Sequence, residues 1–284
     1  MNKISIGQAW SYATSFFTGQ GVHHAIALIG VGIVVPLILQ IAIGGGAVLS
    51  DPMSFATDGG MMAMGAFAIL VGLLNYVLQT GSYFASWRIG LTGGAEPLGA
   101  ALGYGLVAAL PLLLLGFAVV AVLGLVAFLV FGSALAPMMM GEQPSQAAIA
   151  GTGMLLLLLM PLFFLFMLWL AARLCCTGPA MADRRTFNIF TGIGESWRMT
   201  AASQWKIIAY FILLGVAVSV IAMILTMIVG VSMFAGGGVP SGGAMVGIVA
   251  ATLLLGIPMA YLQVGVLAGI YRALGQGGQG DVFA

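Results

Sequence analysis

Residues 106–131 read LVAALPLLLLGFAVVAVLGLVAFLVF, without a single charged, amide or hydroxyl side chain. A helix crosses the hydrocarbon core of a bilayer with about 20 predominantly apolar residues, so this stretch is long enough to span it. Lipid is also the solvent that suits it, because a helix that is apolar on every side presents no polar face to water. We therefore predict a transmembrane helix here.

Five further stretches of the same character flank it, none containing Asp, Glu, Lys or Arg: residues 24–43, 61–85, 152–172, 207–234 and 244–270. The whole chain of 284 residues is 62% hydrophobic and 5% charged, whereas soluble domains carry about 25% charged residues. We predict an all-α polytopic membrane protein with six transmembrane helices, forming a single membrane domain over residues 1–284.

The basic residues predict the orientation. With six spans drawn, all eight fall on the side of the membrane that holds both chain ends: Lys3, Arg88, Arg173, Arg184, Arg185, Arg198, Lys206 and Arg272. The opposite loops carry only Asp51, Asp58 and Glu142. Basic residues favour the cytoplasmic side, so we predict cytoplasmic N- and C-termini in a bacterial inner membrane. The net charge of +1 gives no reason to expect a nucleic-acid partner.

Matching segments indicate an internal repeat. Residues 78–81 (LQTG) precede Arg88, and residues 262–265 (LQVG) precede Arg272, with the same offset of 184 residues throughout. Arg173 closes span four comparably. A long cationic side chain at such a span end can extend to the polar interface. Convergence on these interfacial preferences is the alternative to shared ancestry.

Segments that precede the odd spans also match each other. Residues 6–10 (IGQAW) resemble residues 193–197 (IGESW), and a weaker third copy lies at residues 96–102. In the second copy Ile193, Trp197 and Ala201 fall on one side of a helix, as in amphipathic helices that lie in the membrane interface. We predict three parallel repeats, each an interfacial amphipathic helix followed by a transmembrane hairpin, over approximately residues 1–90, 91–175 and 176–284.

A family resemblance rests on residues 194–200 (GESWRMT), followed by Trp205-Lys206-Ile207-Ile208 and an apolar span. This pattern resembles a bacterial superfamily of six-span membrane proteins. It includes the membrane domain attached to some glycerophosphoryl diester phosphodiesterases and stand-alone proteins of unknown function. The resemblance is specific over residues 193–229 and architectural elsewhere. It implies no enzyme activity, because the soluble phosphodiesterase domain is missing.

The sequence contains no recognisable reaction centre. The span interiors hold no acidic or basic side chain, which argues against an ion-coupled pump. His23 and His24 are adjacent and diverge around a helix, so they are poorly placed to share one metal ion. Cys175 and Cys176 are neighbours that rarely bridge each other. We predict a protein that is not an enzyme, with no catalytic residues, no metal and no cofactor.

Two groups of polar residues are candidate binding sites. Asn75, Gln79 and Gln263 place amides inside spans two and six, with Gln79 about 13 Å from Arg88 along its helix. They would line a polar cavity, or join neighbouring helices by hydrogen bonds. Arg184, Arg185 and Arg198 would contact anionic lipid headgroups, although the need to orient the protein explains these charges equally well.

These observations favour a non-enzymatic inner-membrane protein that organises lipid or a membrane protein complex. The alternative is a transporter or carrier for a neutral or amphiphilic, lipid-like solute, with its pathway between the repeats. The expected partners are the lipid bilayer itself, anionic headgroups and other membrane proteins.

Overall fold

The computed structural model describes residues 5–40, 42, 58–139, 146–235 and 242–276, which form helices joined by short turns and contain no strand. Six of the described helical segments are long and apolar enough to cross a membrane: Gly21–Gln40, Ala68–Leu91, Leu98–Leu125, Leu157–Arg184, Gln204–Ile224 and Leu253–Gly275. Each overlaps one stretch predicted from the sequence. The described residues therefore confirm the predictions of an all-α fold and of six helices that can span a membrane, consistent with an integral membrane protein.

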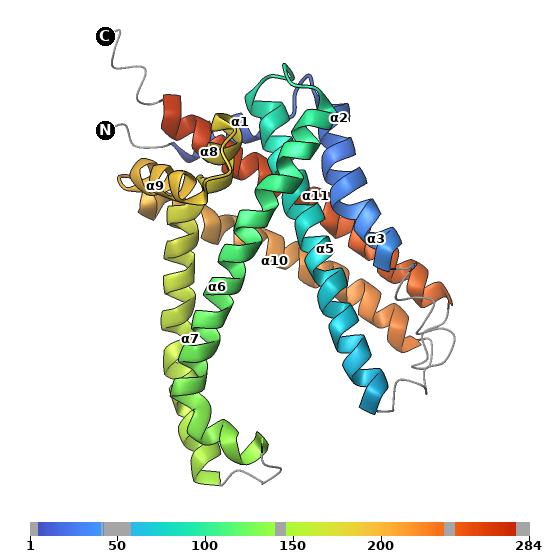
Figure 1. The fold of residues 1–284 in the computed structure, drawn as a ribbon, viewed down its shortest axis with the longest axis vertical. Helices are drawn as coiled ribbons and strands as arrows, with labels where there is room; N and C mark the ends of the chain where they lie inside the picture. The colour runs from blue at the N-terminus through green and yellow to red at the C-terminus, as the bar shows by residue number, and fades with distance from the viewer. Residues whose placement is uncertain (1–4, 41, 43–57, 140–145, 236–241, 277–284) are drawn as a thin grey trace.

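Long helices form most of the molecule: α5 (Asp58–Leu91), α6 (Leu98–Met139), α7 (Gln146–Leu174), α10 (Gln204–Ala235) and α11 (Gly242–Gln276). Three short helices gather at one end, beside the ends of α5 and α11 (Figure 1): α1 (Ile6–Ser15), α8 (Thr177–Arg184) and α9 (Ile189–Thr200). We call this the short-helix end. Among the described residues, Arg184 and Arg198 belong to α8 and α9, and Arg185 follows α8. The other described Lys and Arg residues lie near those ends of α5, α7, α10 and α11 that precede or follow short connections or the described C-terminal end: Arg88, Arg173, Lys206 and Arg272.

The first span changes its helix type midway. It runs through α2 (Gly21–Ala25), the π-helix η1 (Ile26–Val34) and α3 (Val35–Gln40). At the end of η1 the N–H of Val35 donates to the carbonyl of Gly30, five residues back. Pro36 follows directly, and proline has no N–H to continue the ladder. The change from π-helix to α-helix thus coincides with Pro36, which interrupts the regular backbone hydrogen bonding.

Glycines bring two pairs of helices into backbone contact. A Cβ at Gly105 of α6 would collide with the carbonyl oxygen of Gly81 in α5, and a Cβ at Gly269 of α11 would collide with that of Ala9 in α1. Small residues let helices approach in this way inside a bilayer. The α5–α6 and α1–α11 pairs are thereby fixed near the short-helix end.

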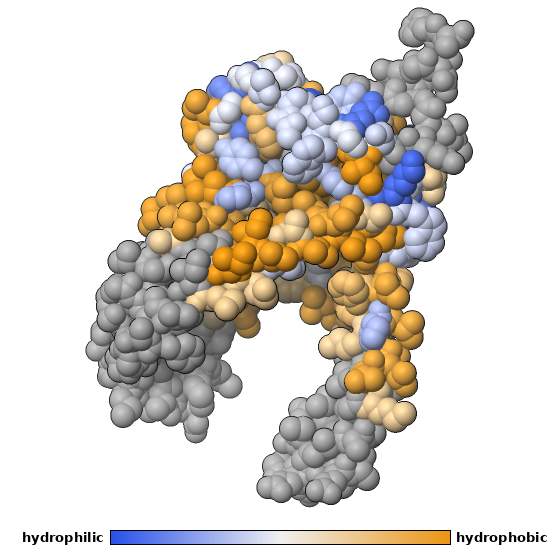
Figure 2. Space-filling view, turned by 180° about the vertical axis from the view of Figure 1, so that it is seen from behind, coloured by the Kyte–Doolittle hydropathy of each residue, from blue (hydrophilic) through white to orange (hydrophobic). Residues whose placement is uncertain are grey.

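Away from that end the helices diverge. The α6–α7 hairpin separates from α3, α5, α10 and α11 (Figure 1), and Figure 2 shows a hollow beneath the main body of the molecule. Large apolar side chains are exposed along the outer faces, with Leu114 at 69%, Leu157 at 75% and Leu213 at 63%. Lipid is the natural solvent for such faces, whereas hydrophilic residues concentrate around the short-helix end (Figure 2).

The repeat is matched only in part by the elements. Short helices α1 and α9 precede spans one and five, as predicted. At the third copy, residues 96–102, there is no separate interfacial helix, because α6 begins at Leu98 and continues as the third span. Helix α9 packs on the protein through Ile189, Gly192, Ser196 and Thr200, which are buried. The organisation into three repeats stays a prediction.

Candidate functional site

A cavity of about 780 Å³ lies between the spans next to the short-helix end. Its side walls come from α5, α6, α7, α10 and α11, and its end wall comes from α8 and α9. Most lining side chains are apolar, and the polar ones are neutral: Tyr76, Gln79, Thr80, Tyr83, Trp87, Cys175, Thr177 and Gln263.

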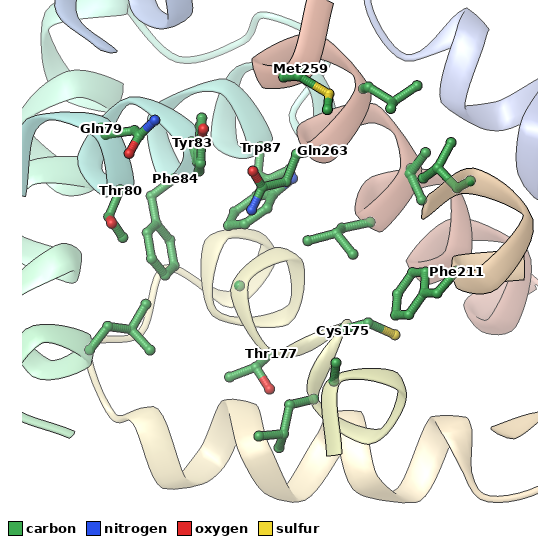
Figure 3. A pocket seen from close by; sticks show the side chains of 18 of the residues that line it. Gln79, Thr80, Tyr83, Phe84, Trp87, Cys175, Thr177, Phe211, Met259 and Gln263 are labelled. Carbon is green, nitrogen blue, oxygen red and sulfur yellow. The ribbon is translucent and has the colours of Figure 1, made fainter. Parts of the chain in front are cut away.

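Two of the three amides singled out from the sequence line this cavity. Gln79 extends from α5 and Gln263 from α11 toward the same space (Figure 3). Both side chains are exposed rather than buried between helices. Asn75 is absent from the lining residues, and its buried Oδ1 has no hydrogen-bond partner. The two glutamines related by the 184-residue offset thus line one cavity, whereas Asn75 is not among its lining residues.

The lining offers no group suited to acid–base or metal chemistry. Among the lining residues that the structure describes, none is Asp, Glu, Lys, Arg or His. No three His, Cys, Asp or Glu side chains gather into a metal-binding group anywhere in the described ranges. The chemistry available to a ligand in the cavity is apolar contact plus neutral hydrogen bonding.

Helix α8 closes the cavity at the short-helix end and is held at its own carboxyl end. The guanidinium of Arg88 donates to the carbonyls of Ala182 at 2.8 Å and Asp183 at 3.0 Å. The hydroxyl of Tyr104 donates to the carbonyl of Met181 at 2.7 Å. The last carbonyls of a helix lack partners within it and carry partial negative charge. A cation and a hydroxyl from α5 and α6 supply the missing donors.

The local sequence explains why a separate helix forms there. Pro179 lies in the first turn of α8, where its missing N–H is not needed. At the other end Arg185 adopts a left-handed conformation, with φ of 51°, and ends the helix. Asn188 then caps α9, its side-chain oxygen accepting from the N–H of Phe190. The chain therefore turns sharply between span four and α9.

Trp87 joins the side wall of the cavity to its end wall. Its indole N–H donates to the carbonyl of Val264 in α11 at 3.0 Å. The indole also packs over Gly178 of α8, where a Cβ would collide with the ring. The side chain is only 6% exposed. Three helices are thus locked together by one aromatic residue.

Helix α9 docks onto the end of α7 through hydroxyl groups. Ser196 Oγ donates to the carbonyl of Arg173 at 2.7 Å and accepts from the N–H of Cys176 at 3.1 Å. The Arg173 guanidinium lies 4.4 Å from the centre of the Trp197 ring and is buried. A span-closing arginine was expected to extend to the polar interface. Arg173 instead is buried against protein groups.

The three arginines predicted to contact headgroups lie at the short-helix end, outside the cavity. Arg184 pairs with Glu195 at 2.7 Å, and Arg185 pairs with Glu96 at 3.3 Å. Arg198 is exposed on α9. Two of the three charges are therefore balanced by carboxylates within the protein. Headgroup binding by these residues stays a prediction.

Sequence reasoning overlooked the residues that close the cavity. Trp87 and Tyr104 both donate buried hydrogen bonds to distant backbone carbonyls, which no local sequence pattern predicts. The Thr177-Gly178-Pro179 run was the available signal, because proline after a span end is typical of a new helix start. The partners of the two aromatic donors lie far away in sequence and left no local trace.

Comparisons with known proteins gave no match: no protein-family model, no curated protein and no solved structure matches the chain. The resemblance of residues 193–229 to the phosphodiesterase-associated membrane domain therefore stays a prediction. The function has to be inferred from the geometry of the cavity itself.

Proposed function

We propose that this protein is a non-enzymatic bacterial inner-membrane protein that holds a lipid-like amphiphile in the cavity between its spans. The short-helix end would face the cytoplasm, in keeping with its basic residues. The observation that carries the proposal is the cavity of about 780 Å³, whose wall is apolar except for a few neutral polar groups. Ligand sites of this kind are concave and mostly apolar, with few polar groups.

The depth of the cavity supports an amphiphile. Tyr76 and Trp87 line it on one helix, which corresponds to about 16 Å along the helix axis. That is about half the thickness of a hydrocarbon core. A lipid could place its polar end beside the glutamines and its chains against the apolar side chains of the wall.

Transport through the protein is less well supported than binding. The end wall is held in place by the Trp87–Val264 hydrogen bond and by Arg88 and Tyr104, which donate to carbonyls at the end of α8. A solute crossing the membrane would have to displace α8 and break these bonds. Holding a lipid requires no such movement.

The test is to fill the cavity and ask whether a bound lipid is lost. Gly215 lines the cavity, and a Cβ built there meets nothing within 4 Å. Gly215→Trp should therefore fold and occupy the space. Gly116→Trp, at an exposed glycine of α6 outside the cavity, is the matched control.

Native mass spectrometry of the detergent-purified protein gives the readout. We expect a tightly retained lipid in the wild type and in Gly116→Trp, and its loss in Gly215→Trp. A wild type without any retained lipid, or equal retention in all three proteins, would contradict the proposal.

A further inference from the structure

We infer that the amphiphile held in this cavity is uncharged at its polar end, an alcohol or carbonyl compound such as a diacylglycerol, and not a phospholipid. The inference rests on the proposed function and specifies the ligand class of the same site. It is carried by three observations: the charge of the wall, the engagement of the span-closing arginines and the chemistry of the two glutamines.

The wall supplies no countercharge. None of the lining residues that the structure describes is acidic, basic or a histidine. An ionised phosphate moved from water into apolar surroundings loses its hydration, and it is tolerated only when a cation or a dense set of donors replaces the water. A hydroxyl or an ester carbonyl makes no such demand.

The arginines that close spans two and four contact other protein groups. Arg88, one residue beyond Trp87, donates to the carbonyls at the end of α8 and pairs with Glu96. Arg173 lies over the Trp197 ring, with Thr200 Oγ1 at 3.4 Å.

The arginine that closes the sixth span is likewise occupied. Arg272 donates to the carbonyl of Gly90 at 2.7 Å and lies 5.2 Å from the centre of the Phe16 ring. All three span-closing arginines thus bind protein groups outside the cavity, and recruiting one for a phosphate would break contacts that hold α8, α9 or α5 in place.

The glutamines suit a neutral polar end. A primary amide both donates and accepts hydrogen bonds, so it can pair with a hydroxyl or with a carbonyl. Gln79 and Gln263 present this group from two helices to one cavity (Figure 3). Thr80 and Tyr83 add hydroxyls to the same wall as Gln79.

A matched pair of probes tests the inference: dioleoylglycerol and dioleoylphosphatidic acid, which share their chains and ester carbonyls and differ by one phosphate. Native mass spectrometry of the full-length protein, titrated with an equimolar mixture, gives the ratio of the two bound forms. We expect at least about tenfold preference for dioleoylglycerol, since only the phosphate must be desolvated without a countercharge.

Variants of the glutamines report where the selection occurs. Gln79→Leu and Gln263→Leu should each weaken dioleoylglycerol binding by about two- to tenfold, the effect of one lost hydrogen bond. Gln263→Lys places a cation in the cavity and should shift the preference toward phosphatidic acid. Gln8→Lys is the control, because Gln8 is exposed on α1, outside the cavity lining.

The outcomes separate the two proposals. Equal binding of the probes, or preference of the wild type for phosphatidic acid, would overturn the neutral-ligand inference while leaving lipid binding intact. If neither probe binds, and no lipid is retained from the membrane, lipid binding itself fails. A shift produced equally by Gln263→Lys and Gln8→Lys would place the selection outside the cavity and also refute the inference.

Discussion

The indole N–H of Trp87 donates a hydrogen bond to the backbone carbonyl of Val264 at 3.0 Å, across 177 positions of sequence. It joins the second span to the sixth at the level where the cavity ends. Val264 directly follows Gln263, and Trp87 itself lines the cavity. The bond therefore fixes the distance between the helices that carry the two glutamines.

Replacing this donor should loosen the wall of the cavity. Trp87→Phe keeps an aromatic ring but removes the hydrogen bond to the Val264 carbonyl, at a cost of about 0.5–1.5 kcal/mol. We expect a lower thermal transition temperature in detergent, measured by light scattering from aggregation because this readout does not depend on tryptophan fluorescence. Trp205→Phe, at a side chain that is 73% exposed, should leave the transition unchanged; an equal loss in both would mean that the buried bond contributes nothing.

The contact between α5 and α6 depends on the absence of a side chain at Gly105. Gly105→Ala places a Cβ against the Gly81 carbonyl and should destabilise the protein by about 1–3 kcal/mol, as overpacking does. Gly116→Ala on the same helix meets nothing within 4 Å and should be neutral or slightly stabilising. Thermal melting of the two variants side by side decides the matter, and identical melting temperatures would refute the close contact.

Arg88 is expected to be a structural residue and not a surface charge. Arg88→Gln removes a donor from the end of α8 and one of the two arginines that pair with Glu96, whose side chain is only 10% exposed. Because Arg185 still pairs with that carboxylate, we expect a loss of about 1–3 kcal/mol. Arg88→Gln combined with Glu96→Gln should lose less than the single variant. Denaturation of both proteins measures this coupling, and strictly additive losses would exclude the ion pair as the cause.

The orientation can be tested at α9. Arg198 is exposed, whereas Cys175 and Cys176 are buried. A cysteine introduced by Arg198→Cys should react with a membrane-impermeant maleimide in inside-out vesicles and not in intact spheroplasts. Labelling in spheroplasts would reverse the predicted topology, and the wild type controls for the two native thiols.

The spans were predictable from the sequence because each needs only its own residues. Residues 106–131 are apolar on every side, and no distant contact is required to make them a membrane helix. Gln79 and Gln263 could be identified for a related reason. An amide in an apolar span needs a hydrogen-bond partner, which lipid does not supply, so it faces a cavity or another helix. The same reasoning could not separate Asn75 from them, because the local sequence does not show which neighbouring helices leave space.

The sequence by itself predicted a membrane protein, the number of its spans, and the location of its basic residues on one side of the membrane. These are properties of hydropathy and charge, which add along the chain. Only the tertiary structure showed that α8 is held as an end wall by Trp87, Tyr104 and Arg88. It also showed that Gln79 and Gln263 line one cavity, whereas the span-closing arginines contact other protein groups. Those relationships join residues far apart in sequence, and a hydrogen bond forms only where folding brings donor and acceptor within about 3 Å.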